Sequence, residues 1–146
     1  MAYVLGKDAK LYHNSGSYAS PTWVEIENVR DLSLSMERAD TDITTRGGGG
    51  WRQSVATLAD GSVDFQMVWD TSDTDFTAIK DAFTGASTIE FLILDGSQAV
   101  AGSQGLRATM AVTGFSRNEG LEDALTVDVS LKTAYAANAP SWYTAT

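Results

Sequence analysis

His13 is the only imidazole in the sequence, and a serine nucleophile would need it as a general base. Ser15 and Ser17 follow it closely in the segment YHNSGSY, residues 12–18. The small polar residues and the glycine of this segment are typical of a loop, where a histidine is usually solvated. We therefore expect His13 to be a solvated residue and not the base of a catalytic triad.

Carboxylates offer the other candidate chemistry. Glu25 with Glu27 and Asp40 with Asp42 are spaced so that each pair shares one strand face, and glycosidases use two such acids. With 19 acidic residues in the chain, such pairs arise readily by chance on solvated faces. The acids of DTSDTD, residues 70–75, have calcium-like spacing but lack the glycine and the glutamate of an EF-hand loop. Helix capping explains them more simply.

No other segment supplies a reactive centre. The chain has no cysteine, so disulfides and thiolate metal sites are not available to it. The run RGGGG at residues 46–50 is not followed by the lysine and Ser/Thr of a phosphate-binding loop. We therefore predict a protein that is not an enzyme and that needs neither a metal nor a cofactor.

The charge of the chain is strongly one-sided. Ten basic against 19 acidic residues give a formal net charge of −9, spread along the sequence. Because nucleic-acid binding requires basic side chains to neutralise phosphates, a sequence-reading nucleic-acid binder is not expected. No apolar run exceeds five residues, which predicts neither a signal-peptide core nor a membrane span. We expect a protein that stays in a reducing compartment or leaves it without Sec-type secretion.

Alternation of apolar and polar residues dominates the chain and predicts strands with one apolar and one polar face. These strands must position any functional side chain. We expect them at residues 22–29, 31–38, 62–69, 88–94, 106–112 and 124–132, with an N-terminal hairpin over residues 3–12 that turns near Gly6–Asp8. The pattern predicts a mainly β fold, a single-domain β-sandwich or partly closed barrel.

One segment, residues 72–85, has helical spacing instead. Ser72 or Asp73 stands where an N-cap belongs, and Gly85 where a C-terminal cap belongs. This predicts one short helix of about three turns packed on the sheet. The side chains expected to be buried beneath it are Phe76, Ile79 and Phe83.

Four consecutive glycines lie in TTRGGGGWRQSV, residues 44–55, between two arginines and beside a tryptophan. Extended, residues 38–46 alone would span about 30 Å, whereas a domain of this size has a radius of gyration of about 15 Å. Ordering four glycines costs about 4–8 kcal/mol, which tryptophan and arginine can offset at an interface. The residues predict a long hairpin arm over about 38–58, with a floppy surface loop as the alternative.

Three blocks of the sequence resemble, in order and spacing, the tail tube (major tail) proteins of phages with long, non-contractile tails. The resemblance extends from about residue 3 to residue 136, and its most specific part is the middle block, where the arm precedes SVDFQMVWD. The blocks are GKDAKLY, ERADTDITTRGGGGWRQSVATLADGSVDFQMVWD and AGSQGLRATMAVTGFSRNEGLEDALTVDVSLKTAY.

The resemblance implies a β-sandwich with one helix that assembles into stacked hexameric rings around a tape-measure protein, leaving a channel for DNA. Tail-tip and terminator proteins would be further partners. The protein would reside in the virion tail after assembly in the host cytoplasm, with no membrane insertion. An acidic channel would let DNA pass without specific binding, and Asp64 and Asp128 are candidates to face the lumen.

In such proteins a long hairpin crosses to the neighbouring subunit or ring. Its glycine tip would be disordered in the monomer and ordered by its neighbours. The inter-subunit arm residues implied here are Asp42, Thr45, Arg46, Gly47, Gly48, Gly49, Gly50, Trp51 and Arg52.

We expect a single tail-tube domain over residues 1–146 with a C-terminal tail from about residue 136 to residue 146. Two alternatives stay open. One is a tube protein of a contractile tail, a gene transfer agent or a secretion machine. The other is a monomeric carbohydrate- or receptor-binding β-sandwich, whose aromatic platform would be formed by Tyr18, Trp23 and Trp142.

Overall fold

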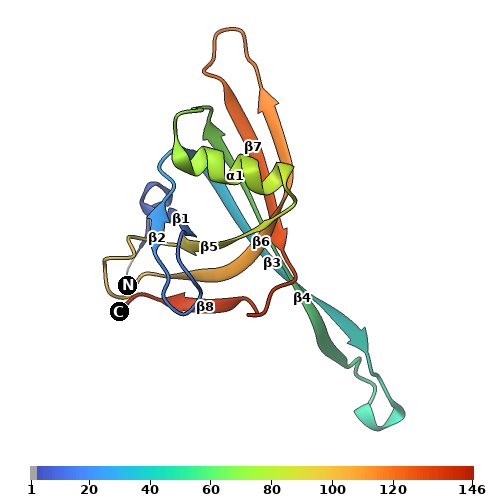
Figure 1. Ribbon diagram of the computed structural model, residues 1–146. Coiled ribbons are helices and arrows are strands. Elements are labelled where there is room, and N and C mark those ends of the chain that lie inside the picture. Colours follow the sequence, from blue (N-terminus) through green and yellow to red (C-terminus); the bar gives the residue numbers. More distant parts are fainter. Residues whose placement is uncertain (1–2) are drawn as a thin grey trace.

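The computed structural model describes residues 3–146 and contains an eight-stranded antiparallel sheet and one α-helix (Figure 1). The first two residues of the predicted domain lie outside the described residues. The elements are the 3₁₀ turn η1 (Gly6–Asp8), β1 (Lys10–Asn14), β2 (Trp23–Glu25), β3 (Val29–Asp42), the 3₁₀ turn η2 (Arg46–Gly48), β4 (Ser54–Val68), α1 (Thr74–Thr84), β5 (Thr88–Leu94), β6 (Gln104–Asn118), β7 (Thr126–Thr133) and β8 (Ser141–Thr144).

The sheet folds over on itself at β6. The strand order is β2-β1-β5-β6-β7-β4-β3, and β8 also pairs with β6. The first half of β6 pairs with β5 and β8. Its second half, from Met110, pairs with β7, with a register shift between Val112 and Gly114. Figure 1 shows β6 curving from one group of strands to the other. The predicted mainly β fold is confirmed, and because the sheet is not closed its arrangement agrees with a sandwich.

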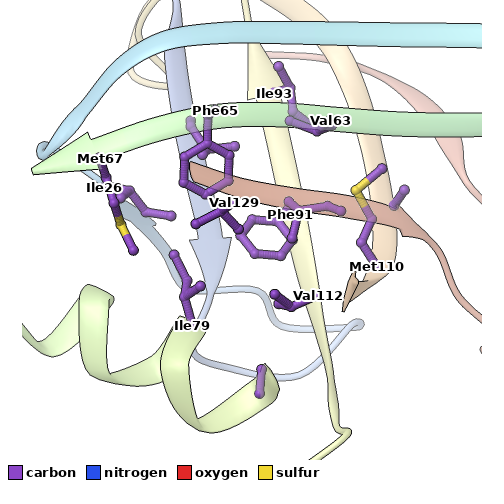
Figure 2. Close-up of a cluster of buried hydrophobic side chains, with 14 of the residues drawn as sticks. Ile26, Val63, Phe65, Met67, Ile79, Phe91, Ile93, Met110, Val112 and Val129 are labelled. Atoms are coloured by element: carbon purple, nitrogen blue, oxygen red, sulfur yellow. The ribbon is translucent and has the colours of Figure 1, made fainter. Parts of the chain in front are cut away.

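The core lies between these two groups of strands and the helix (Figure 2). Strand alternation turns one face of each strand inward, and burying each large apolar side chain contributes about 1.5–3 kcal/mol. Four strands supply most of the buried side chains of this core. They are Val63, Phe65 and Met67 of β4, Val127, Val129 and Leu131 of β7, Phe91 and Ile93 of β5, and Leu106, Ala108 and Met110 of β6.

Helix α1 begins and ends where its caps predict. The Asp73 carboxylate accepts a hydrogen bond from the Asp75 backbone N–H at 3.2 Å, and Gly85 is the C-cap. Phe76 and Ile79 are buried as expected. The Phe76 ring packs edge-on against Trp69, with the ring centroids 4.7 Å apart.

The expected burial of Phe83 is wrong. Its side chain is 42% exposed, and Ala82 occupies the buried position instead. The stripe of α1 that touches the sheet therefore continues from Ile79 to Ala82, at i+3, rather than to Phe83 at i+4. Phe83 lies at the edge of this contact and stacks on Phe115 of β6, with the ring centroids 5.9 Å apart.

The expectation of a solvated loop histidine is also wrong. His13 lies on β1, its side chain is only 12% exposed, and its Nε2 is 2.6 Å from Asp75 Oδ1 in the first turn of α1. A second contact reinforces this one, since Asn28 Nδ2 donates to Asp73 Oδ2 at 2.7 Å. These two polar contacts hold the start of the helix against β1 and the β2–β3 connection.

The N-terminal hairpin predicted over residues 3–12 does not form. Residues 3–5 are exposed and belong to no strand, and the turn at η1 leads into β1. β1 pairs instead with β2 and with β5, which follows much later in the chain. Pairing with the apolar β5 places Leu11 and Tyr12 in buried positions.

Phe76→Ala should lower the free energy of unfolding by about 3–5 kcal/mol, because it empties a buried aromatic site beneath α1. Phe83→Ala, on the same helix, should cost only about 1 kcal/mol because its ring is already partly solvated. Urea unfolding followed by circular dichroism would measure both. A loss for Phe83→Ala as large as that for Phe76→Ala would contradict the packing described here.

Candidate assembly surfaces

The β3–β4 hairpin extends far beyond the core and includes the predicted arm. Its ladder continues from Leu32 opposite Phe65 in the core to Asp42 opposite Ser54. From residue 35 to residue 60 every residue except Gly48 is exposed. Figure 1 shows this hairpin projecting away from the other strands. The backbone leaves the body at the buried Gly61, where an added Cβ would lie 3.1 Å from the side chain of Thr133.

The tip of the arm is closed by its own hydrogen bonds. The Ile43 N–H donates to the Gln53 carbonyl, and the Gln53 N–H donates to Thr44 Oγ1, both at 2.9 Å. Gly49 and Gly50 have φ values of +66° and +89°, a left-handed conformation that side chains disfavour. Two of the four glycines are thus required by the turn itself.

Asp42 anchors the first side of this tip. Its Oδ1 accepts a hydrogen bond from the Thr44 backbone N–H at 2.7 Å. Hydrogen bonds from the Thr44 side chain and backbone hold the pKa of Asp42 below its ordinary value of 3.8, because they favour the charged carboxylate. The carboxylate acts here as a local turn-forming group.

Apolar side chains on the arm have no protein surface to cover them within this chain. Trp51 is 78% exposed and Leu58 is 81% exposed, and the other exposed large apolar residues of the arm are Met36, Ile43 and Val55. The sequence analysis identified Trp51 as an arm residue but missed Leu58. Leu58 could have been identified as an apolar residue within the predicted arm, where it cannot reach the core. Exposed apolar residues gathered on one projection indicate an interaction surface.

The arm tip is also basic. Residues 43–53 contain Arg46 and Arg52 and no acidic residue, in a chain whose net charge is −9. Arginine and tryptophan side by side are the residue types most enriched at the centres of protein interfaces. The tip therefore combines a positive charge with an exposed aromatic ring.

The opposite end of the same hairpin presents a polar face. Asp64 on β4 accepts a hydrogen bond from Ser130 Oγ of β7 at 2.7 Å. Asp128 on β7 accepts from Gln66 Nε2 at 3.2 Å and from Asn118 Nδ2 at 2.6 Å. A shallow hollow of about 290 Å³ lies between these strands. The structure thus brings the two predicted lumen residues together on one exposed face, away from the arm tip.

Two strands of this layer have free backbone edges. Among the described strands, β3 pairs with β4 alone, and β6 beyond Val112 pairs with β7 alone. Unpaired strand edges offer rows of N–H and C=O groups to another chain. The layer β6-β7-β4-β3 can therefore be extended on both sides.

The predicted aromatic platform is not assembled as an open surface. The Arg107 guanidinium lies 3.9 Å from the centroid of the Tyr18 ring and 5.1 Å from that of Trp23. Arg107 also pairs with Glu90, with Nε 2.9 Å from Oε2. One face of each ring is therefore occupied by Arg107, which belongs to a partly buried ion pair. Trp142 is exposed and donates from Nε1 to Gln104.

Of the candidate acids Glu25 and Glu27, Glu25 alone lies on β2, and it is engaged in an ion pair. Glu25 Oε1 lies 2.9 Å from Lys10 Nζ, and this contact raises the pKa of Lys10. Glu25 and Glu27 line a cavity of about 720 Å³ beside η1. Across residues 3–146 no three His, Cys, Asp or Glu side chains gather as a metal ion would require. No helix in the described part of the chain is long and apolar enough to cross a membrane.

Comparisons with known proteins identify the fold. No protein-family model and no curated protein matches the sequence. A chain from the tail of an empty gene transfer agent particle with C6 symmetry aligns with a TM-score of 0.72 and 19% identity, over 95% of this chain and 98% of that one.

Two further solved structures agree. A chain from the virion of a native gene transfer agent particle gives a TM-score of 0.71 and 17% identity, over 95% of this chain and 98% of that one. The SPP1 tail tube gives 0.71 and 15% identity, over 90% of this chain and 76% of that one. The chain therefore has the fold of tail tube proteins, as the sequence resemblance implied.

The Asp42 turn should depend on pH in a defined direction. Because the folded pKa is lowered, the ordering of the tip should be complete above pH 3.8 and lost as pH falls through the lowered pKa. The Thr44 amide resonance should therefore titrate with a midpoint below 3.8. Asp42→Ala should speed hydrogen exchange at Gln53, whereas Asp40→Ala, two residues earlier on β3, should not. A midpoint above 3.8 would contradict this assignment.

Proposed function

We propose that this chain is the structural subunit of a tail tube, a conduit for DNA built by self-assembly of hexameric rings that stack. The observation that carries this proposal is the projecting β3–β4 arm. The hairpin projects from the body of the protein, so the exposed side chains of Trp51 and Leu58 add nothing to the core of the monomer. Burying these apolar side chains against a second molecule would remove them from water and so would stabilise an assembly.

The two free strand edges support ring formation. An interface between β3 of one copy and the second half of β6 of the next joins two different surfaces of the chain. Such heterologous contacts close into a ring when the rotation between copies is a whole fraction of a turn. Strand-to-strand pairing would give these contacts directional backbone hydrogen bonds.

The polar face supports the role of a conduit. Strands β4 and β7 present Asp64 and Asp128 among uncharged polar residues, with Lys132 of β7 also on this face. Six copies of a chain with a net charge of −9 would bring a formal charge of −54, six times −9, to each ring. With this face turned to the lumen, its carboxylates would outnumber the Lys132 ammonium group, so DNA would gain little from counterion release and would not adhere. Repulsion within a Debye length of about 8 Å would help to keep it centred.

The remaining assignments follow from this role. The subunit is a non-enzymatic structural protein of the virion tail, assembled in the host cytoplasm. A tape-measure protein would occupy the tube during assembly, and tail-tip and terminator proteins would cover its ends. The fold supports a tube of a phage or of a gene transfer agent equally.

Size-exclusion chromatography combined with negative-stain electron microscopy of the purified protein tests the proposal. We expect rings and stacked tubes with a central channel. A protein that stays monomeric at high concentration and binds oligosaccharides would instead support the carbohydrate-binding alternative, and the tube proposal would be withdrawn.

Deleting Gly47–Gly50, or replacing Trp51 by alanine, should leave the monomer folded but block polymerisation. Loss of a central interface tryptophan typically costs about 2 kcal/mol or more, which corresponds to about a thirtyfold rise in critical concentration. Circular dichroism would check the fold, and tube counts by negative stain would measure assembly. Trp51→Phe is the matched control and should retain most tubes. Normal tubes from the deletion variant would refute the role of the arm.

Asp64→Lys combined with Asp128→Lys should still permit tubes but should make them bind DNA, most strongly at low salt, because each new lysine can neutralise a phosphate. Filter binding of DNA to assembled tubes across a salt series would measure this. Asp64→Asn with Asp128→Asn removes the charge without reversing it and should give little binding. Tight, salt-sensitive binding by wild-type tubes would rule out an acidic lumen.

A further inference from the structure

The residues of the arm tip specify the chemistry of the surface that can bind it. It exposes Trp51 beside Arg52, with Arg46 on the other side of the glycines, and residues 43–53 contain no acid. A complementary surface must offer an exposed apolar side chain together with unneutralised carboxylates, because complementary charge orients partners and excludes incorrect ones.

The turn between β6 and β7, residues 119–125, has this composition. Leu121 at its tip is fully exposed, and Glu122 and Asp123 follow it directly. Neither of these two acids makes an ion pair with any side chain in residues 3–146, whereas Glu119 pairs with Arg117. Residues 119–123 (EGLED) thus carry charges opposite to those of residues 46–52 (RGGGGWR), and each segment exposes one large apolar side chain.

This turn and the arm tip lie at opposite ends of one layer of strands. Asn118 and Thr126, which flank the turn, pair with each other, and Thr126 pairs with Val68 at the last residue of β4. The arm tip precedes the first residue of β4, Ser54. Figure 1 shows the two hairpins pointing in opposite directions. They therefore cannot meet within one molecule.

We propose that the arm tip of one copy docks on the β6–β7 turn of a second copy in the next ring of the stack. This inference rests on the proposed tube function and specifies its partner surface. Trp51 packs on Leu121, and Arg46 and Arg52 face Glu122 and Asp123. Because each copy has one basic end and one acidic end, the contact is heterologous and repeats along the tube axis, which is how open assemblies grow.

Charge reversal tests the pairing. Glu122→Lys with Asp123→Lys should raise the critical concentration for tube formation about tenfold or more, since several charge pairs become repulsive. Arg46→Glu with Arg52→Glu should do the same. Combining all four substitutions in one chain should restore tubes, because the two ends again carry opposite charges. Undiminished assembly of the first variant, or no recovery in the fourfold variant, would overturn this inference while leaving the tube function in place.

Cross-linking tests the contact without disturbing its charges. The chain has no cysteine, so Gly47→Cys with Ala124→Cys introduces the only thiols. Ala124 is an exposed residue of the β6–β7 turn. Gly120 is avoided because a side chain there would displace the Asp123 carboxylate. A flexible bis-maleimide added to assembled tubes should give ladders longer than dimers on denaturing gels. Gly47→Cys with Val100→Cys, an exposed position on the β5–β6 connection, is the matched control and should give none.

The outcomes separate the two proposals. Tubes of the Gly47→Cys, Ala124→Cys variant that give no ladder would overturn the docking surface alone. Wild-type protein that forms no tubes would overturn the proposed function, and this inference with it.

Discussion

Backbone hydrogen bonds between β3 and β4 join the core of this protein to its arm in one continuous ladder. At one end Phe65 and Met67 of β4 are buried in the core, and at the other Asp42 pairs with Ser54 beyond any core contact. The buried half supplies the hydrophobic stabilisation that holds the exposed half in place. An arm of this length can project because its base is part of the sandwich, and it leaves the body at Gly61.

The same ladder separates two kinds of surface. Near the core, the outward face bears Asp64 and Asp128, whose carboxylates are held by Ser130, Gln66 and Asn118. Toward the tip the charge becomes positive and apolar side chains are exposed. In the proposed tube, the face that would let a polyanion pass and the tip that would bind another protein lie at opposite ends of one layer of strands. This polarity along a single direction suits a subunit that stacks head to tail.

Several features were predictable because they depend on residues close together in sequence. Alternation located most strands, since successive side chains of a strand point to opposite faces. Asp73 and Gly85 marked the ends of α1, because caps act within one helical turn. The four glycines between Arg46 and Trp51, in a segment too long to be sheltered by the core, predicted a long hairpin arm with a glycine tip. The strand content, the single helix and the projecting hairpin were therefore determined by the sequence itself.

Other features were decided only by tertiary packing. Ala82 is buried and Phe83 is not, because of how far α1 is rotated about its axis on the sheet. Helical spacing does not specify this rotation, since positions i+3 and i+4 from Ile79 lie on nearly the same side of the helix. His13 acquires a partner in Asp75 because β1 pairs with β5 and so lies beneath the helix. The free edges of β3 and β6, and the placement of the β6–β7 turn opposite the arm, follow from strand order. Strand order results from contacts between distant segments, so local periodicity leaves it open.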